Sequence, residues 1–524
     1  MTRNSLERRK VFFGRLASLP VIAFVVALAL LSVACNNVNL AGKGSGTVSL
    51  AIDEVLASEI RSAIPAHLRS TTGDNSTYTL TASIRGDYSD EKTESATSLS
   101  GVTFTFEGIP TGKNIILDVT VKVGDNTIWY GNSGKHMVDS GINKLNVEVG
   151  RVSGVLLWKL NVDSGNHNIL TAPYGAYDSP GETKITFGAS DSSQGTPFCF
   201  DGDGNLYVMP SNTTPTQIEK YDLQPDGTYA YSYRNILTNG QVFNHLAYDS
   251  VAGTLYGIGG EQAVLYYWKS NENFEPVQGY TVNTGSCLGL AAHDNVVYTI
   301  EPGREDSDAV QYATVKSYSI SIEESDAGDT AQSTSKDVKE DSFLLPSFCT
   351  SNYTGQMIYQ DGALYLLLRR FEINGASNAS ADNSVEHYSL GALAKIDPNT
   401  LTLDTSFGNG GYLGLSHSSV TFSNREDSGN TFNVTYHGSA AENNTFFGPV
   451  GFVAVMPKKL VIADAGFSMT DGGDGKVNLE KKARILTVDL EEKVFDDEPL
   501  DAAYFQEGYP QFTSSGYTYI NETN

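Results

Sequence analysis

The stretch "FCFDGDGNLYVMP", residues 198–210, decides how the larger, C-terminal part of the chain is interpreted. Apolar residues alternate on either side of a short polar core, and this period of two is typical of two β-strands joined by a turn. The core "DGDGN" is also rich in the oxygen ligands of a calcium loop. Recurrence along the chain separates the two interpretations, because a structural unit repeats whereas a single metal loop need not.

The same phrase does recur. It consists of two apolar residues one apart, a polar turn, and then Leu-Tyr or a close variant. Further copies are "LAYDSVAGTLYGIG" (246–259), "LAAHDNVVYTI" (290–300), "MIYQDGALYLLL" (357–368), a degenerate "FVAVMPKKLVIAD" (452–464) and "FTSSGYTYI" (512–520). A second alternating phrase follows each of the first five copies. Six copies of a strand pair followed by further strands predict an all-β chain built of small sheets that stack radially, which is a β-propeller.

We therefore expect residues 151–524 to form a six-bladed propeller. Seven blades are the main alternative, because the interval from Tyr365 to Val461 is long enough to hold another. The unmatched phrase "LLWKLNVDSG" (156–165) is predicted to pair with the C-terminal "FTSSGYTYI", so that the two ends of the domain close the ring. Closure of this kind leaves only short, protected sheet edges.

The "DGNLYV" phrase resembles bacterial propeller repeats of the NHL and related kinds. The string "LDTSFGNGGYLGL" (403–415) is similar to the delta-60 repeat, which also implies a propeller strand. Neither resemblance implies a particular ligand or cofactor.

A different domain is predicted for residues 47–150, where six short segments alternate in period two and favour a small β-sandwich. Between the first two of them, Leu56, Ile60, Ile64 and Leu68 predict an amphipathic helix interrupted at Pro65. The stretches "FTFEGIPTGKNIILDVTV" (104–121) and "GINKLNVEV" (141–149) resemble prealbumin-like sandwiches, which implies that the module is a spacer.

The N-terminus is predicted to be an export signal of residues 1–34. Five basic residues precede the apolar core "LPVIAFVVALALLSVA" (19–34), which is short for a membrane span. "LSVAC" resembles the lipobox of bacterial lipoproteins, so Cys35 is expected to carry the lipid anchor. Asn36 after it favours an outer-membrane or cell-surface location by the same resemblance, and residues 35–46 are expected to form a flexible tether.

The charge of the chain limits its partners. The formal net charge is −26, and removal of the export signal, with five positive charges and Glu7, makes it more negative. Nucleic acid and anionic lipid bind through positive surfaces, so this composition argues against both as general partners.

A calcium site at the opening stretch is disfavoured. Asp201, Asp203 and Asn205 match the first three ligand positions of an EF-hand loop, but Leu206 and Asn212 stand where the glycine and the bidentate carboxylate are needed. The other copies of the phrase replace the acids freely, as expected for a turn that needs only residues tolerating positive φ. The string "DGGDGK" (471–476) is interpreted in the same way.

Catalytic and cofactor sites are not indicated by any motif. The eight histidines have no metal-binding spacing, although His245 and His293, near inner strands, could be gathered from different blades as in some propeller lyases. Cys199, Cys287 and Cys349 are expected to be small buried residues near the axis, with a disulfide only where blade geometry permits. Trp158 and Trp268 are expected to pack between blades, and with Trp129 they are the only tryptophans.

Long insertions follow the first phrases, at 301–313, 371–391 and 466–483, and residues 416–450 precede the fifth copy. Turns inside the first hairpins are short, so the insertions are predicted to share the opposite face of the propeller. The acidic run 323–341 is expected to be a solvated loop. We expect a non-catalytic envelope protein that binds protein or glycan through the long-loop face. The alternative is a metal-dependent propeller lyase or hydrolase.

Overall fold

The computed structural model describes the chain from Gly44 to Glu522 with gaps. The described residues are 44–63, 77–123, 126–145, 147–151, 155–161, 166–172, 181–188, 197–201, 205–209, 217–223, 229–238, 240–259, 264–269, 275–281, 287–304, 311–323, 332–346, 349, 354–373, 385–415, 419–423, 433–437, 445–446, 449–456, 458–464, 467–473, 476–481, 484–499 and 520–522. They are nearly all β, as predicted, and among them no helix is long and apolar enough to cross a membrane.

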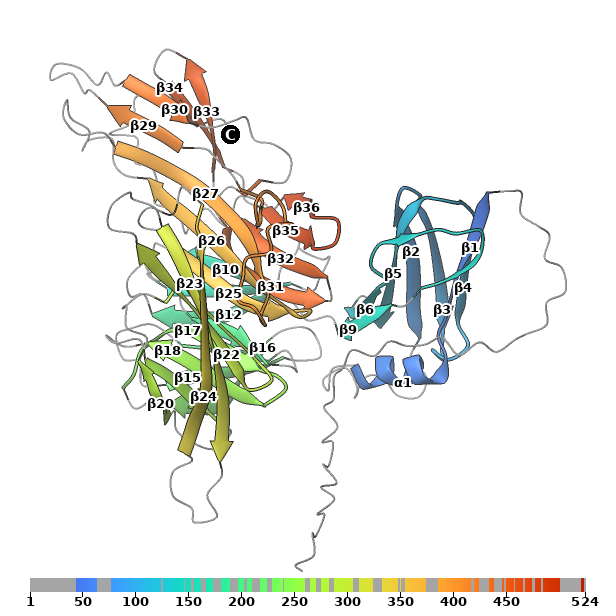
Figure 1. Cartoon of the computed structure of the whole chain (residues 1–524), viewed down its shortest axis with the longest axis horizontal. Helices are drawn as coiled ribbons and strands as arrows, with labels where there is room; N and C mark the ends of the chain where they lie inside the picture. Colours follow the sequence, from blue (N-terminus) through green and yellow to red (C-terminus); the bar gives the residue numbers. More distant parts are fainter. Residues whose placement is uncertain are drawn as a thin grey trace, which may run out of the picture.

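The N-terminal part is a sandwich of two sheets, with strand orders β4-β1-β8 and β3-β2-β5-β6-β9 and with β7 paired to β5 (Figure 1). Its elements are β1 (Ser45–Ala51), α1 (Glu54–Ala63), β2 (Tyr78–Gly86), β3 (Asp90–Ala96), β4 (Thr103–Pro110), β5 (Asn114–Val123), β6 (Asn126–Asn132), β7 (His136–Met137), β8 (Gly141–Lys144) and β9 (Glu148–Arg151).

The sandwich core follows from the alternation in the sequence. Val48 and Leu50 of β1 face Leu80 and Ile84 of β2 within one buried cluster. The predicted helix is α1, whose first turn is capped by the Asp53 carboxylate accepting from the Leu56 amide at 2.8 Å. Pro65 and Leu68 lie outside the described residues.

The C-terminal part is a series of antiparallel sheets. The N-terminal sheet holds β10 (Val155–Asn161), β11 (Asn166–Ala172) and β12 (Gly181–Gly188). Sheet I holds β13 (Phe198–Phe200), β14 (Leu206–Val208), β15 (Gln217–Leu223) and β16 (Tyr229–Leu237), and sheet II holds β17 (Phe243–Asp249), β18 (Thr254–Gly259), β19 (Val264–Trp268) and β20 (Glu275–Thr281). Sheet III holds β21 (Gly289–His293), β22 (Val296–Arg304), β23 (Gln311–Glu323) and β24 (Gln332–Leu344).

Two sheets carry additional strands. Sheet IV holds β25 (Thr354–Gln360), β26 (Ala363–Ile373), β27 (Val385–Ile396), β28 (Tyr412–Leu413), β29 (Ser419–Ser423) and β30 (Asn433–His437). Sheet V holds β31 (Pro449–Met456), β32 (Lys459–Asp464), β35 (Arg484–Asp489) and β36 (Val494–Pro499), while β33 (Phe467–Gly473) and β34 (Lys476–Lys481) pair separately, together with β37 (Ile520–Glu522).

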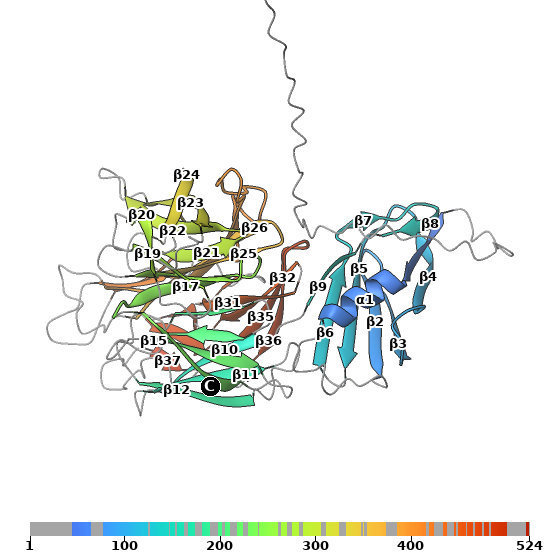
Figure 2. The ribbon, with the colours of Figure 1, turned by 90° about the horizontal axis from the view of Figure 1, so that it is seen from below.

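The opening phrase is a strand, a turn and a strand, as predicted. Phe200 of β13 pairs with Leu206 of β14, and the next four copies of the phrase form the first two strands of sheets II to V. The first strands of neighbouring sheets lie against one another, β13 on β17, β17 on β21, β21 on β25 and β25 on β31. The result is a propeller-like stack, which Figure 2 shows from below.

The long interval between Tyr365 and Val461 is occupied by added strands of sheet IV. Among the described residues, β29 pairs with the outer part of β27 and with β30, so they extend this sheet and do not begin another.

Two expectations from the sequence differ from the structure: the solvated loop at 323–341 and the pairing of the two chain ends. Most of the acidic run 323–341 is strand, because β24 pairs with β23 from Tyr312↔Leu344 to Glu323↔Gln332. Alternating apolar residues in β23, such as Tyr318 and Ile320, are buried and give the polar segment a partner that its own sequence did not indicate.

The expected pairing of the two chain ends is not seen among the described residues. β10 pairs with β11, and Ile520, the last residue of the C-terminal phrase, lies in β37, which pairs in parallel with β34. Residues 512–519 of that phrase lie outside the described residues.

Aspartates at the first turns join neighbouring sheets. Asp249, fully buried at the end of β17, accepts from the amides of Val251 and Ala252 in its own turn, at 3.0 Å each. It also accepts from Asp294 at 3.1 Å and Asn295 at 2.7 Å, in the turn of sheet III. Asp294 and Asn295 have φ of 49° and 61°, as expected for a tight hairpin.

Asp361, which is exposed, makes a similar contact between sheets IV and V, because its carboxylate accepts from the Lys458 amide of sheet V at 2.5 Å. The tyrosines of the Leu-Tyr phrase add aromatic contacts across the other two boundaries, between sheets I and II and between sheets III and IV. Tyr207 stacks on Tyr248 at a centroid distance of 5.6 Å, and Tyr298 stacks on Tyr359 at 6.2 Å. The turn acids and tyrosines therefore hold one sheet to the next.

Removing the Asp249 carboxylate should destabilise the stack. Asp249→Ala leaves four backbone amides without their acceptor, two of them in the next sheet, and we expect a loss of about 3 kcal/mol in the free energy of unfolding. Chemical denaturation followed by tryptophan fluorescence measures this. Glu340→Ala, at an exposed carboxylate of β24, is the control and should change stability by less than about 0.5 kcal/mol. Equal effects of the two changes would contradict the proposed joint.

Candidate functional site

The long insertions leave the sheets at the strand ends opposite the first turns. The β22–β23 pair continues to Arg304↔Gln311, and the β26–β27 pair continues to Ile373↔His387. β33 and β34 lie between β32 and β35 in the chain, after Asp464. We call these strand ends the insertion edge and the ends with the first turns the short-turn edge.

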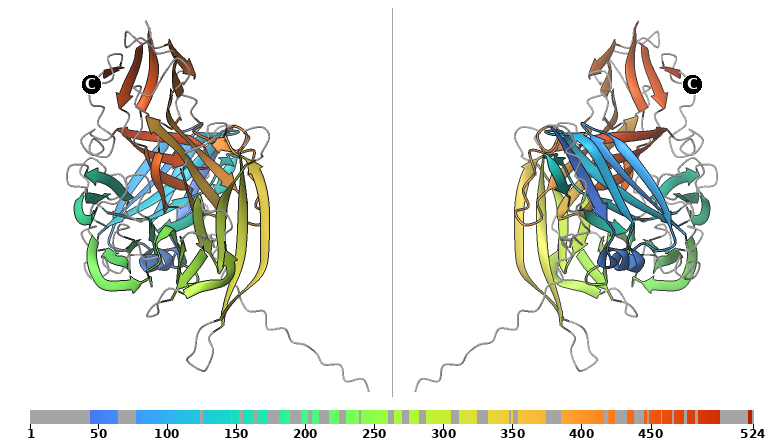
Figure 3. Two further views of the ribbon diagram at one scale, coloured as in Figure 1. Left: turned by 90° about the vertical axis from the view of Figure 1, so that its left-hand side faces the viewer. Right: turned by 90° about the vertical axis from the view of Figure 1, so that its right-hand side faces the viewer.

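The insertion strands, defined as β29, β30, β33 and β34 together with the outer ends of β26 and β27, project together beyond the other sheets. Figures 1 and 3 show them in orange to red, with β29 and β30 beyond the end of β27 and with β33 and β34 near them. β29 and β30, the described strands within the stretch 416–450, therefore lie on the same side of the molecule as the other insertion strands, as the sequence predicted.

A buried ion pair fixes the place where β33 and β34 leave sheet V. Asp464 and Arg484 are the last cross-strand pair of β32 and β35. The Asp464 carboxylate is fully buried and accepts from Arg484 Nε at 3.0 Å and Nη2 at 2.8 Å. Arg484 Nη2 also donates to the carbonyl of Thr445, just before β31. The base of the insertion is thus held by a charge pair that connects three segments.

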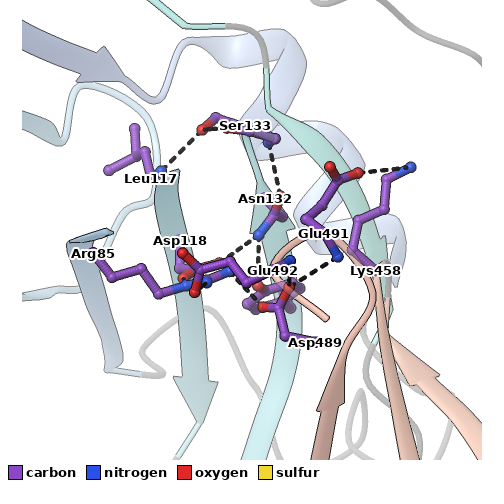
Figure 4. A network of polar contacts seen from close by, with 11 residues as sticks. Arg85, Leu117, Asp118, Asn132, Ser133, Lys458, Asp489, Glu491 and Glu492 are labelled. Atoms are coloured by element: carbon purple, nitrogen blue, oxygen red, sulfur yellow. Dashed lines mark hydrogen bonds and ion pairs between the residues drawn. The ribbon is translucent and has the colours of Figure 1, made fainter. Parts of the chain in front are cut away.

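At the other end of the same strands, sheet V meets the sandwich. Arg85 of β2 forms ion pairs with Asp118 of β5 and with Asp489 and Glu492 of the β35–β36 turn, with 2.6 Å between Arg85 Nη2 and Asp489 Oδ2. Figure 4 shows the guanidinium between the carboxylates of the two domains. We call this cluster the Arg85 joint.

Hydrogen bonds within the sandwich hold its side of the joint in place. Asp118 is 6% exposed and accepts from the Tyr130 hydroxyl and from Asn132 Nδ2, the latter at 2.7 Å. Burial, followed by the nearby charge of Asp118, raises the pKa of Tyr130, so the phenol remains a donor at every physiological pH. Burial opposes the charge on Arg85, but its hydrogen bond to Asp118 and the surrounding carboxylates raise its pKa on balance.

The propeller side is fixed by the turn itself. Asp489 Oδ1 accepts from the amides of Glu491 at 3.0 Å and Glu492 at 2.9 Å. The Leu490 amide donates to the Lys458 carbonyl at 2.9 Å, which ties this turn to the first turn of sheet V. The joint therefore lies on the short-turn edge.

The joint and the base of the insertion are opposite ends of one strand pair. β32 and β35 pair from Lys459↔Asp489, next to the joint, to Asp464↔Arg484, below the insertion. Five residue steps of extended strand span about 17 Å. A two-stranded segment of a buried sheet is stiff, so the sandwich sets the direction in which the insertion strands point.

Asp201 and Asn205 of the opening stretch contact each other across a turn, as the sequence predicted. Asp201 Oδ1 accepts from the Asn205 amide at 2.9 Å, and Oδ2 accepts from Asn205 Nδ2 at 3.0 Å. Asp203 lies outside the described residues. Within the described part of the chain, no three His, Cys, Asp or Glu residues are placed to share a metal ion.

The two singled-out histidines have separate surroundings. His245 hydrogen-bonds through Nε2 to the Cys287 carbonyl at 2.7 Å, and burial lowers its pKa. His293 stacks on Tyr359 with 3.9 Å between ring centroids. These contacts hold each ring against a neighbouring sheet.

The three cysteines of the folded part are free thiols in this structure. Cys349 is buried, whereas Cys199 and Cys287 are partly exposed. Burial raises the pKa of Cys287 to about 12 and also raises that of Cys199. Such thiols are protonated near neutral pH and are poor nucleophiles.

The tryptophans and the expected lipidation site remain. Trp268 packs edge-on against Tyr207 of sheet I, as expected for a residue between blades, and Trp129 is buried in the sandwich core. The side chain of Trp158 and the expected lipidation site Cys35 lie outside the described structure.

The Arg85 joint is the feature that sequence reasoning missed. Arg85 stands at an outward position of "YTLTASIRG" (78–86), which marks it only as a surface residue. Its partners in the β35–β36 turn are some 400 positions away, and no local pattern connects them.

Removing Arg85 should release the sandwich from sheet V. Arg85→Ala leaves three carboxylates facing one another, and we expect interdomain docking to weaken by roughly 2–3 kcal/mol. Calorimetry should then resolve separate unfolding transitions, and small-angle scattering should show a larger radius of gyration. Arg61→Ala removes the exposed pair with Glu54 at 2.6 Å and should have almost no effect. A single unchanged transition in Arg85→Ala would show that the joint does not hold the domains together.

Removing Arg484 should lower the free energy of unfolding more than removing one member of a partly exposed ion pair. In Arg484→Met the buried Asp464 carboxylate loses its counter-charge, and we expect about 3–5 kcal/mol of destabilisation in chemical denaturation. Asp464→Asn in the same chain should recover part of the loss, because the buried group is then neutral. Lys395→Met is the comparison, since its 3.1 Å pair with Asp404 is about one-third exposed on each side. Similar losses of stability in Arg484→Met and Lys395→Met would contradict the proposed role of the Asp464–Arg484 pair in holding the base of the insertion.

Comparison with known proteins gives one family match. Residues 311–512 match the family model described as the TdpA C-terminal domain, and this range contains every insertion strand. The match covers less than half of the chain. No curated protein matches it.

Solved structures give weak similarities. TolB from Acinetobacter baumannii has 8% identity and a TM-score of 0.29, covering 74% of this chain and 76% of its own. A protein of unknown function from Bacteroides thetaiotaomicron has 11% identity and a TM-score of 0.29, covering 74% and 82%. Hydrazine synthase from Kuenenia stuttgartiensis has 8% identity and a TM-score of 0.29, covering 64% and 76%. The comparisons therefore relate residues 311–512, and not the whole chain, to the TdpA C-terminal domain.

Proposed function

We propose that this protein is a lipid-anchored cell-envelope protein whose insertion strands bind a protein or a glycan. The observation that carries the proposal is the placement of the two ends of β32 and β35. The sandwich, which follows the expected anchor in the chain, holds the short-turn edge through Arg85, and the insertion strands leave from the opposite edge. Strands added to a rigid scaffold, away from its support, are suited to binding.

The location follows from the N-terminal sequence. Export by the signal of residues 1–34 and lipidation of Cys35 would leave residues 36–43 between the lipid and Gly44, where the described fold begins. The outer membrane is the proposed site, with the propeller facing the periplasm or the exterior. The proposed boundary between the sandwich, 47–150, and the propeller, 151–524, is supported by the end of β9 at Arg151 and the start of β10 at Val155.

We also propose that the propeller has six blades, sheets I to V and the N-terminal sheet. β10 lies against β31 and β32 of sheet V, which is the position that a sixth blade occupies. Ring closure through the C-terminal phrase stays a prediction for residues 512–519.

Deletion of the insertion strands tests the binding function. Asp464↔Arg484 is a paired position, so removal of 467–481 leaves residues 465–466 and 482–483 as a four-residue hairpin loop. Removal of 419–437 leaves 416–418 and 438–444 as a connection and keeps Phe446, which is buried in the core of sheet V. Both deletions should keep the thermal transition and abolish retention on glycan arrays or envelope extracts.

The matched control shortens the β23–β24 turn at the short-turn edge. Removal of 325–330 leaves a two-residue turn next to the pair Glu323↔Gln332 and should leave binding unchanged. Unaltered binding after both insertion deletions would overturn the proposal. The metal-dependent enzyme stays an alternative, and metal analysis of untagged protein tests it, because a catalytic metal site should be occupied near stoichiometry.

A further inference from the structure

The rim of the sandwich around the start of β1 carries exposed apolar and basic side chains together. Among the described residues, six large apolar side chains are exposed, and two of them, Met137 at 57% and Ile142 at 72%, lie within six positions of each other. Lys113, Lys135 and Lys144 are exposed around them. We call these five residues the rim patch.

The patch is fixed next to the place where the chain enters the sandwich. β8 pairs in parallel with the start of β1, Gly46↔Gly141 and Thr47↔Ile142. A Cβ on Gly46 would come within 2.3 Å of the Asp139 carbonyl and 2.6 Å of Val138 Cγ1, so the loop before β8 packs directly on β1. Asn143 holds that loop, accepting from the Asp139 amide at 2.8 Å and donating to its carbonyl at 2.9 Å.

Met137 and Lys113 belong to the same rim. Met137 pairs with Asn114 at the start of β5, and the Val138 amide donates to the Lys113 carbonyl at 2.8 Å. Ile142 and Lys144 are alternate residues of β8 and point to the same side, whereas Asn143 between them is buried. Met137, Ile142 and Lys144 are therefore displayed by paired strands, and Lys113 and Lys135 lie directly before β5 and β7.

The β8 part of the patch, Ile142 and Lys144, lies on the sheet away from the Arg85 joint, whereas Met137 in β7 pairs with the start of β5 in the other sheet. β8 belongs to the sheet β4-β1-β8, whereas the Arg85 joint lies on the other sheet of the sandwich. Figure 2 shows β4 and β8 on the side of the sandwich opposite to the one beside β32 and β36. The propeller thus leaves this face of the sandwich open.

We propose that the rim patch is a membrane contact that lays the sandwich on an anionic bilayer surface. The eight residues 36–43 between the expected lipid at Cys35 and Gly44 span about 30 Å at most, so the rim cannot be far from the headgroups. Apolar side chains ringed by lysines are the composition of surfaces that rest at the headgroup boundary. This step rests on the proposed anchor, and not on the proposed binding by the insertion strands.

The net charge of the whole chain does not oppose this contact. Charges more than about 8–10 Å away are largely screened at physiological ionic strength, so the local charges decide the attraction. The rim has three lysines against Asp87 and Asp139, in a chain with 35 basic and 61 acidic residues. Each lysine near an anionic surface strengthens binding about five-fold.

Vesicle sedimentation of the chain from residue 36 onward, which contains every described residue but lacks the lipid, tests the contact. We expect binding to vesicles of phosphatidylcholine with phosphatidylglycerol, weaker binding to phosphatidylcholine alone, and a decrease with salt. Met137→Ser with Ile142→Ser should reduce binding about ten-fold. Lys135→Glu with Lys144→Glu should reduce it about 25-fold or more.

Val251→Ser is the matched control, because Val251 is 53% exposed but lies in a turn of sheet II, and it should bind as the parent does. The insertion deletions should also bind vesicles normally, which separates this test from that of the proposed function. Absence of vesicle binding, or equal binding by the rim and control variants, would overturn the proposal. So would a dimer in sedimentation velocity that only the rim variants lose, since a second copy would then cover the patch.

Discussion

The propeller-like part depends on one constraint, which is that its sheets I to V carry apolar side chains on both faces. In β22, Val297 packs into the cluster shared with sheet II, while Tyr298 and Ile300 pack into the cluster shared with sheet IV. A single four-stranded sheet leaves both faces in water, and one with a single neighbour still leaves one, whereas burying a side chain of this size is worth roughly 1.5–3 kcal/mol. Sheets of this kind are therefore stable only between two neighbours.

The carboxylates at the two ends of this stack have different structural roles. At the short-turn edge, Asp249 and Asp361 accept backbone amides of the following sheet and set the register between sheets. At the insertion edge of sheet V, Asp464 is buried with Arg484 below the added strands. Asp249 and Asp464 are buried, and each is compensated by donors fixed in the backbone or in a guanidinium, because an uncompensated buried charge would cost more than the sheet contacts around it supply.

The sequence was sufficient to predict what depends on local pattern. Alternation and short turns predicted the strand pairs of sheets I to V, and recurrence identified "DGDGN" as a turn, in which Asp201 indeed contacts Asn205. It was insufficient where a partner decides the structure. The polar segment 332–341 became a strand because β23 offered it an edge, and β29 joined β27 through its backbone, which no side-chain pattern records.

The Arg85 joint shows why a polar contact between domains is suited to orientation. An apolar interface of the same size would be favourable in several relative positions of the two domains. A charge cluster is favourable in only one arrangement, because any other leaves buried carboxylates without their partner. Tyr130 and Asn132 fix Asp118 on one side, and the turn amides of Glu491 and Glu492 fix Asp489 on the other. Little of the interaction energy is then spent on ordering the groups. The strand pair β32–β35 carries this fixed direction from the joint to the base of the insertion, so a sandwich held at a surface also sets where the insertion strands point.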